Sequence, residues 1–168
     1  MVNHAGTPVY VHVKVCVIDD VWAAVGSDNV NLRSWTHDSE LSCAVVDDTA
    51  DTREPQDPGG LGDGARRFAR ELRLLLVREH LGREAPRDRE ASDELRDPGG
   101  TFDAFTSAAA APDSWYERGC PGPRPPGRLR ACRAPRLSRW ERALAMPLYR
   151  ALVDPDGRPQ RPRRRNSF

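Results

Sequence analysis

The sequence has 168 residues, of which 38% are hydrophobic and 30% are charged, together with 15 prolines and 13 glycines. This supply of apolar side chains supports one domain, is marginal for two, and leaves part of the chain unable to pack. The formal net charge of +1 excludes a strong overall attraction to nucleic acid or to an anionic membrane.

Signals for secretion, membrane insertion and metal binding are weak or missing. Met1-Val2-Asn3-His4 lacks the basic start and apolar stretch of a signal peptide, and no run reaches the roughly 18 apolar residues of a transmembrane helix. The four cysteines show no C-x-x-C spacing, so no metal or other cofactor is predicted. Cys16 and Cys43 fall in strand-like runs, where buried free thiols are expected, and a reducing, cytoplasmic location follows.

A small sheet is predicted near the start of the chain. Valines at every odd position from Val9 to Val17 give the period of two that is typical of a β-strand, and we expect this valine face to pack under a helix. The elements that follow are a turn at Asp19-Asp20, a returning strand over 21–25, a loop or short helix over 29–35, and a third strand over 40–46.

The middle of the chain predicts helices. After a loop over residues 49–60, residues 63–81 favour an amphipathic helix, with Gly82 as its C-terminal cap. Its buried stripe is expected to hold Phe68, Leu72, Leu75 and Leu76. The remaining segments are a charged linker over 83–96, a second helix over 102–116, an irregular region over 119–136, an apolar patch over 140–152, and a basic tail with Arg158, Arg161, Arg163, Arg164 and Arg165.

This pattern favours an α/β fold in which a mixed β-sheet is flanked by helices. We expect a half-domain over residues 1–82, followed over 83–168 by a linker, short helices and a poorly ordered tail rich in proline and arginine. The tail is interpreted as a solvated end, because runs of like charge among prolines are usually disordered.

The residues with the clearest chemistry are His12 and Lys14, and Lys14 is the only lysine in the chain. Residues two apart on a strand point to the same face, so we expect the two side chains to lie together. An imidazole beside a fixed ammonium suits a phosphate group. The lysine neutralises an oxygen, while the imidazole attacks phosphorus or gives a proton to the leaving group.

Two further segments can complete such a site. Gly26-Ser27-Asp28-Asn29 follows the returning strand, where glycine allows close backbone approach and the Ser27 hydroxyl and Asn29 amide can bind phosphate oxygens. Glu40 begins the next strand. Its carboxylate is expected to accept the second ring N–H of His12 and so fix the tautomer. The alternative for Asn29 is that it caps a short helix.

The pattern His12-x-Lys14-x4-Asp19-x6-Gly26-Ser27-x-Asn29 resembles the signature of the phospholipase D superfamily. The likeness continues through Asn31-Leu32-Arg33-Ser34 and Asp38-Ser39-Glu40, and it covers about residues 8–47. The helix that follows matches more loosely, and the stretch from Pro147 to Gly157 is similar to the C-terminal end of bacterial members. In this family the reaction passes through a phosphohistidine intermediate without a metal, after which water gives hydrolysis or an alcohol gives transfer.

The resemblance assigns a role to each matching position. His12 corresponds to the catalytic histidine, and Lys14 to the lysine that binds phosphate. Ser27 and Asn29 correspond to the polar residues of the phosphate pocket. The remaining members of the predicted catalytic set are Asp19, the motif aspartate, which is expected to act mainly in the turn, and Glu40, the acid that orients the histidine.

The family builds one active site from two copies of the motif, whereas this sequence holds one. The simplest hypothesis is that the chain is the C-terminal part of a two-motif enzyme and supplies the second histidine, which the resemblance assigns as the general acid. The partner half would come from a missing N-terminal region or from another chain. The expected substrate is a phospholipid or another phosphodiester.

Three alternatives stay open. The protein could be a phosphatidyltransferase similar to cardiolipin synthase, a nuclease of the same family, or a catalytically inactive remnant that binds phosphate or a partner chain through its sheet edge. The other histidines, His4, His37 and His80, lack a comparable setting and are interpreted as structural or surface residues. Trp22 and Trp35 are expected in the core or in the wall of the pocket.

Overall fold

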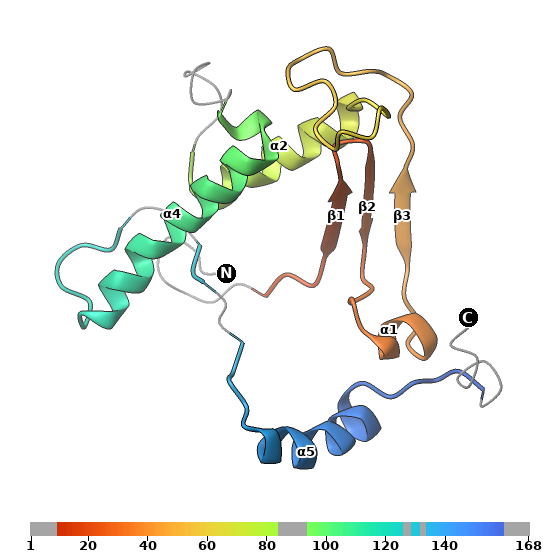
Figure 1. Cartoon of the computed structure of the whole chain (residues 1–168), viewed down its shortest axis with the longest axis vertical. Coiled ribbons are helices and arrows are strands. Elements are labelled where there is room, and N and C mark those ends of the chain that lie inside the picture. Colours follow the sequence, from red (N-terminus) through yellow and green to blue (C-terminus); the bar gives the residue numbers. More distant parts are fainter. Residues whose placement is uncertain (1–9, 84–93, 126–128, 132–133, 160–168) are drawn as a thin grey trace. The chain divides into compact units, whose positions relative to one another are not determined.

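The computed structural model describes residues 10–83, 94–125, 129–131 and 134–159 (Figure 1). Predictions for His4, Val9, Cys132 and the arginines from 161 to 165 lie outside these ranges. The elements are β1 (Lys14–Ile18), β2 (Trp22–Gly26), α1 (Leu32–Thr36), β3 (Ser42–Val45), α2 (Arg67–Leu81), α4 (Pro98–Glu117), α5 (Arg139–Leu148) and the π-helix η1 (Tyr149–Val153).

The three strands form one antiparallel sheet in the order β1-β2-β3, which confirms the predicted α/β class. Asp19 and Asp20 make the turn between β1 and β2, with φ angles of 51° and 58°. The Val21 N–H donates to the Ile18 carbonyl at 2.9 Å. Positive φ at both central residues is the type I′ arrangement, whose twist matches that of paired strands, and Asp tolerates it.

The prediction that the valine face is buried is wrong. Val11, Val13 and Val15 are 54%, 57% and 39% exposed, and β1 begins at Lys14 rather than near residue 9. Valines at alternate positions indicate which side chains share one face of a strand, but they do not show whether another element packs on that face. Cys16 and Cys43 are free thiols, as expected, but both are exposed instead of buried.

The described residues fall into two compact units that interleave along the chain. The first unit includes Val15–Ala24 and the described residues from Ala44 to 131, with α2 and α4. The second unit includes His12–Lys14, Val25–Cys43 and the described residues from 134 onward, with α1, α5 and η1. The domain boundary expected at residue 82 stays a prediction.

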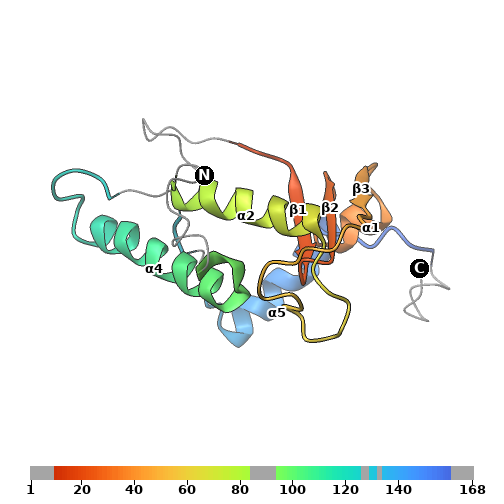
Figure 2. The same cartoon turned by 90° about the horizontal axis from the view of Figure 1, so that it is seen from above.

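The apolar core of the first unit lies where α2 and α4 run side by side (Figures 1 and 2). Both helices were predicted, and Gly82 ends α2 with a φ of 67°, the left-handed conformation that favours glycine at a helix C-terminus. The core residues are Leu74, Val77, Leu81, Leu95 and Ala104, with Phe105, Ala108 and Leu129 packed against them.

The buried face of α2 is not the predicted one. Phe68 and Leu75 are 40% and 63% exposed, and with Leu72 they line an open groove of about 450 Å³. The helix instead buries a face that includes Arg70, which is fully inaccessible to solvent. Hydropathy could not predict this rotation of the helix, because a charged residue is rarely buried unless it is paired.

Arg70 is buried because it binds the carboxylate of Asp20. Its Nε atom lies 3.0 Å from Asp20 Oδ2, and the two side chains are 0% and 1% exposed. Arg73 binds the same carboxylate, with Nε 2.6 Å from Oδ1 and Nη2 2.7 Å from Oδ2. Two guanidinium groups therefore satisfy both oxygens of one buried carboxylate, which offsets the cost of removing it from water.

The same arginines bind the chain on either side of α2. Arg70 donates to the carbonyl oxygens of Arg53, at 2.6 Å, and of Pro55. Arg73 Nη1 donates to the Leu95 carbonyl at 2.8 Å and to the Thr101 hydroxyl at 3.0 Å, at the start of α4. The turn, the loop after residue 50 and the beginning of α4 are thus joined through one pair of side chains.

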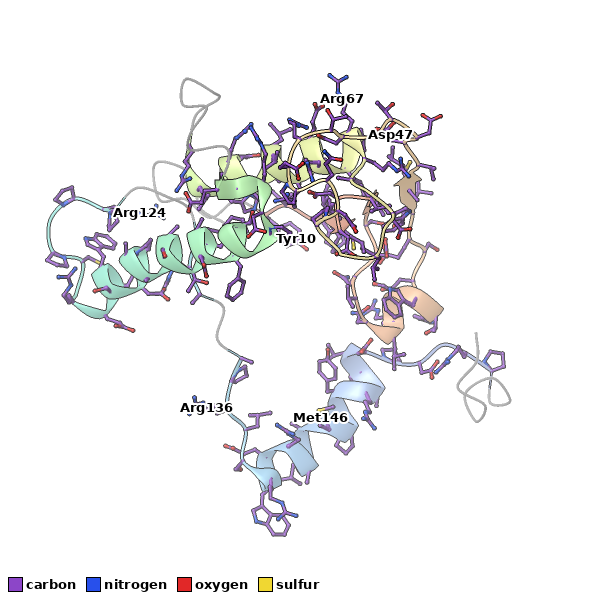
Figure 3. All side chains as sticks on the ribbon, turned by 45° about the horizontal axis from the view of Figure 1, so that its top comes forward. Tyr10, Asp47, Arg67, Arg124, Arg136 and Met146 are labelled. Carbon is purple, nitrogen blue, oxygen red and sulfur yellow. The ribbon has the colours of Figure 1, made fainter. Side chains whose placement is uncertain are left out.

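The N-terminus of α2 is bound by an acidic residue from outside the helix. The Phe68 N–H donates to Asp47 Oδ2 at 2.9 Å, and Asp47 lies near the labelled Arg67 in Figure 3. That N–H group, followed by the Thr49 N–H, lowers the pKa of Asp47. A carboxylate here satisfies one of the unpaired N–H groups of the first turn.

Within the described ranges, no helix has a stretch long and apolar enough to cross a bilayer.

Replacing Asp20 by Asn should destabilise the protein by roughly 3 kcal/mol, because the buried Arg70 and the partly buried Arg73 would lose the carboxylate that they share. Asp19→Asn is the matched control. It makes the same change one residue earlier, on an exposed side chain, and Asn also tolerates positive φ. Urea unfolding followed by circular dichroism measures both variants. Equal stability of the two would contradict the role of the Asp20 ion pairs.

Acid should weaken the loop after residue 50. The Arg53 guanidinium lowers the pKa of Asp51 from 3.8 to about 2. A lowered pKa stabilises the fold above the unfolded value of 3.8, and this contribution is lost as the pH falls towards 2. Asp51→Asn should therefore cost roughly 2 kcal/mol near neutral pH, and the difference from wild type should shrink below pH 3.8. A difference that is constant with pH would contradict this.

Candidate active site

His12 and Lys14 come together at the start of β1. The Lys14 Nζ atom lies 2.9 Å from His12 Nε2 and 3.2 Å from His12 Nδ1. It also donates to the main-chain carbonyls of His12, at 3.1 Å, and of Ser27, at 3.0 Å. An ammonium group has only donors, so the ring nitrogen that accepts from it must carry a lone pair.

Glu40 binds two serine hydroxyls beside this pair. Ser27 Oγ donates to Glu40 Oε2 at 2.6 Å, and Ser34 Oγ donates to Oε1 at 3.0 Å. The hydrogen bond from Ser27 and then that from Ser34 lower the pKa of Glu40 below 4.5, with a smaller contribution from the charge of Lys14. The carboxylate is therefore ionised at neutral pH, and both of its oxygens are held by hydroxyl groups.

Asn29 belongs to the same network. Its Nδ2 atom donates to Ser34 Oγ at 3.3 Å, so Ser34 connects Asn29 to Glu40. The alternative in which Asn29 caps a helix is not what the structure has. The cap of α1 is Asn31, whose side-chain oxygen accepts from the Ser34 N–H at 2.9 Å. The cap thus places Ser34 on the first turn of α1, facing Glu40 and Asn29.

The loop needs glycine at position 26. A Cβ atom there would lie 2.8 Å from the carbonyl oxygen of Leu41 and would also clash with the Ser42 hydroxyl, which binds Asp28. The Ser27 N–H donates to the same Leu41 carbonyl at 3.0 Å. A residue with a side chain would therefore push the strand that follows Glu40 away from Ser27.

A distant part of the chain completes the surroundings of α1. The Arg33 N–H donates to Asp154 Oδ1 at 2.7 Å, and the Gly157 N–H donates to Thr36 Oγ1 at 2.8 Å. Both contacts lie within the second unit. Residues that follow η1 therefore bind α1 at two places, the Arg33 N–H in its first turn and the Thr36 hydroxyl at its end.

Five of the predicted site residues belong to the second unit: His12, Lys14, Ser27, Asn29 and Glu40. Asp19 is not brought to them, because it lies in the turn at the other end of β1. The buried aspartate of that turn is its neighbour Asp20. The contacts described for Glu40 go to Ser27 and Ser34, so its action on His12 stays a prediction, as do the catalytic roles of the set.

Sequence reasoning missed Ser34, Asn31 and Asp154 as parts of the site. Ser34 and Asn31 stand in the Asn31-Leu32-Arg33-Ser34 segment, and the three-residue spacing of a helix cap was the signal for their contact. No local pattern connects Asp154 to α1.

Trp35, expected in the core or pocket wall, is 51% exposed. In the described part of the chain, no three His, Cys, Asp or Glu side chains gather so that they could hold a metal ion.

Comparison with known proteins finds relatives of one kind. The chain is 40% identical to "Phospholipase D C" of Dictyostelium discoideum over 93 residues, which is 53% of this chain and 5% of the relative. It is 40% identical to "Phospholipase D1" of Schizosaccharomyces pombe over 79 residues, 45% of this chain and 6% of that protein. It is 38% identical to "Phospholipase D1" of Mus musculus over 92 residues, 54% of this chain and 8% of the mouse protein.

The chain thus corresponds to a small part of these relatives, between 5% and 8% of their length. No family model matches the sequence. No solved structure shows a significant match. Seven curated proteins match significantly, and all seven bear the name phospholipase D. Over about half of its length, the chain is therefore a relative of the phospholipase D superfamily.

Proposed function

We propose that this chain carries one half of the active site of a phospholipase D-type phosphodiesterase. The observation that supports it most is the position of Lys14 Nζ, within 3.2 Å of both His12 ring nitrogens and 3.0 Å from the Ser27 carbonyl. The same cation can bind a phosphate oxygen and hold it next to the ring. The similarity to proteins named phospholipase D supports a phospholipid as the substrate.

In the proposed reaction, phosphate oxygens bind to Lys14 and to the second N–H of the Asn29 side chain, while Ser27, whose only O–H donates to Glu40, positions Lys14 through its carbonyl. The lone pair of a His12 ring nitrogen attacks phosphorus, a P–N bond forms, and the P–O bond to the head-group alcohol breaks. A histidine from a second motif gives its proton to the leaving oxygen. The histidine of the second motif, now neutral, takes a proton from water as the water oxygen attacks the phosphohistidine, the P–N bond breaks, and phosphatidic acid is released. In the assignment expected from the sequence, the two halves exchange these roles and His12 supplies the proton to the leaving oxygen.

Glu40 has an indirect part in this proposal. As an ionised acceptor, it fixes the hydroxyl hydrogens of Ser27 and Ser34 towards itself. The oxygen of Ser27 accepts in turn from the Leu41 N–H at 3.2 Å. The loop that presents the Ser27 carbonyl to Lys14 is thereby kept in one conformation, and Glu40 acts as a positioning residue rather than a reacting one.

His12→Ala and Lys14→Ala should each lower turnover at least about 100-fold in the assembled enzyme, because the first removes the reacting imidazole and the second removes the phosphate-binding cation. His37→Ala is the matched control, an exposed histidine outside this network. Head-group release from phosphatidylcholine measures all three variants, with circular dichroism to check folding. Full activity in either His12→Ala or Lys14→Ala would exclude its assigned role.

Hydrolysis and transfer can be separated with the same preparation. With ethanol present, a phosphohistidine intermediate should partition between water and alcohol and give phosphatidylethanol beside phosphatidic acid. The inactive remnant is the alternative that the single motif favours. It would bind inorganic phosphate weakly and would form neither product, even at high protein concentration.

Glu40→Gln should lower kcat by a similar factor at every pH between about 5 and about 8. The pKa of Glu40 lies below 4.5, so the carboxylate stays ionised across this range and does not cause the acidic limb of the pH–rate profile. Stopped assays over a pH series give the profile. A loss in Glu40→Gln that appears at only one end of the range would show that Glu40 exchanges a proton during turnover.

A further inference from the structure

Helix α5 exposes an apolar stripe to solvent. Trp140, Leu144 and Leu148 are 82%, 76% and 63% exposed. Residues four apart share one face of an α-helix, so these three side chains lie in a row. The stripe continues past the helix with Leu152, which is 73% exposed, and no residue of α5 or η1 is buried. An uncovered row of this size is typical of a surface that binds a partner.

The other face of α5 is basic. Arg139 and Arg142 are exposed and fall on the side away from Trp140 and Leu144, at 100° per residue, and Arg150, in η1, is exposed as well. From residue 136 to residue 150 the chain has four arginines and one acidic residue, Glu141. Arg136, in front of the helix, is labelled in Figure 3 together with Met146 on α5.

Local interactions begin the helix, although no buried side chain anchors it to the rest of the chain. Ser138 and Glu141 form a capping box, in which the Ser138 N–H donates to Glu141 Oε2 at 2.7 Å and the Glu141 N–H donates to Ser138 Oγ at 3.3 Å. The Ser138 N–H, followed by its hydroxyl, lowers the pKa of Glu141, so this cap is charged at neutral pH. A helix that is stabilised by its own N-terminal capping box can expose its apolar face and bind a lipid surface with it.

The helix is also joined to the candidate site. It continues through η1 into Asp154, which accepts the hydrogen bond from the Arg33 N–H of α1. Gly157, three residues later, binds Thr36 at the end of the same helix. Because α1 carries Ser34, whatever binds the exposed face of α5 would be linked, through η1 and α1, to the loop that is proposed to bind phosphate.

We propose that α5 lies in the surface of an anionic phospholipid layer, with Trp140, Leu144 and Leu148 among the acyl chains and the arginines among the phosphates. The choice of a lipid over a protein partner rests on the proposed function and on the charge of the polar face. An Arg-rich face opposite a Trp/Leu face is the pattern of interfacial helices, and each arginine gains from the negative surface potential. In this arrangement α5 holds the enzyme at the layer that contains its substrate.

Vesicle binding of the His12→Ala chain tests this proposal without turnover. The probes are vesicles of phosphatidylcholine alone and of an equimolar mixture of phosphatidylcholine and phosphatidylglycerol. Leu144→Gln combined with Leu148→Gln should weaken binding to the mixed vesicles at least about tenfold. Leu61→Gln is the matched control, because Leu61 is 75% exposed and lies outside α5. Unchanged binding in the double variant would overturn the proposal.

The charged face gives an independent comparison. Arg139→Gln with Arg142→Gln should weaken binding to the mixed vesicles about tenfold and leave binding to pure phosphatidylcholine unchanged, since each arginine contributes only near anionic lipid. An equal loss on both vesicle types would overturn the electrostatic part. If α5 instead binds a second copy of the chain, sedimentation will show a dimer that the Leu144→Gln/Leu148→Gln variant loses, with vesicle binding unaffected.

The proposed function can fail separately from this inference. Turnover of a dispersed short-chain phospholipid by the assembled enzyme does not need a lipid surface, so it reports on His12 and Lys14 alone. Vesicle binding by the His12→Ala chain with no turnover by the assembled wild-type enzyme would retain the inference and reject the function. Turnover of the dispersed substrate in a protein that binds no vesicles would do the reverse.

Discussion

The first unit depends on one buried carboxylate. Asp20 stands in a tight turn, and its two oxygens are held by Arg70 and Arg73 from α2. Those arginines also donate to carbonyls of the loop after residue 50 and of the segment before α4. A strand turn, a helix and two connections are thus fixed by a charge that would be costly to bury alone. The aspartate that keeps this framework together is the one after the motif aspartate.

The second unit is organised by a different carboxylate. Glu40 is half-buried, and both of its oxygens accept hydrogen bonds from serine hydroxyls. Asp20 is bound by two guanidinium groups, whereas Glu40 is bound by two neutral hydroxyl groups. The two acids therefore hold their neighbours in place by different means, Asp20 through ion pairs and Glu40 through hydrogen bonds alone.

Local patterns predicted most of the elements. The period of two, the Asp19-Asp20 pair and Gly82 indicated β1, its turn and the end of α2, because each reflects backbone geometry within a few residues. Burial could not be read in the same way. Leu75 resembles a core residue but is exposed, and Arg70 resembles a surface residue but is buried, since the orientation of α2 is set by ion pairs to Asp20, 50 residues away. The motif spacing predicted that His12 and Lys14 would meet, but it carried no information about Asp154.

The contacts between α1 and the residues after η1 also constrain how the protein matures. Arg33 and Asp154 are 121 residues apart, and so are Thr36 and Gly157. On the ribosome, the histidine and lysine of the nascent chain emerge long before their support does, and the closing of so long a loop is slow. Helix α1 and the loop that contacts it therefore acquire their final contacts only late in translation, and a product that stops short of residue 154 would contain His12 and Lys14 but lack the contacts that hold α1.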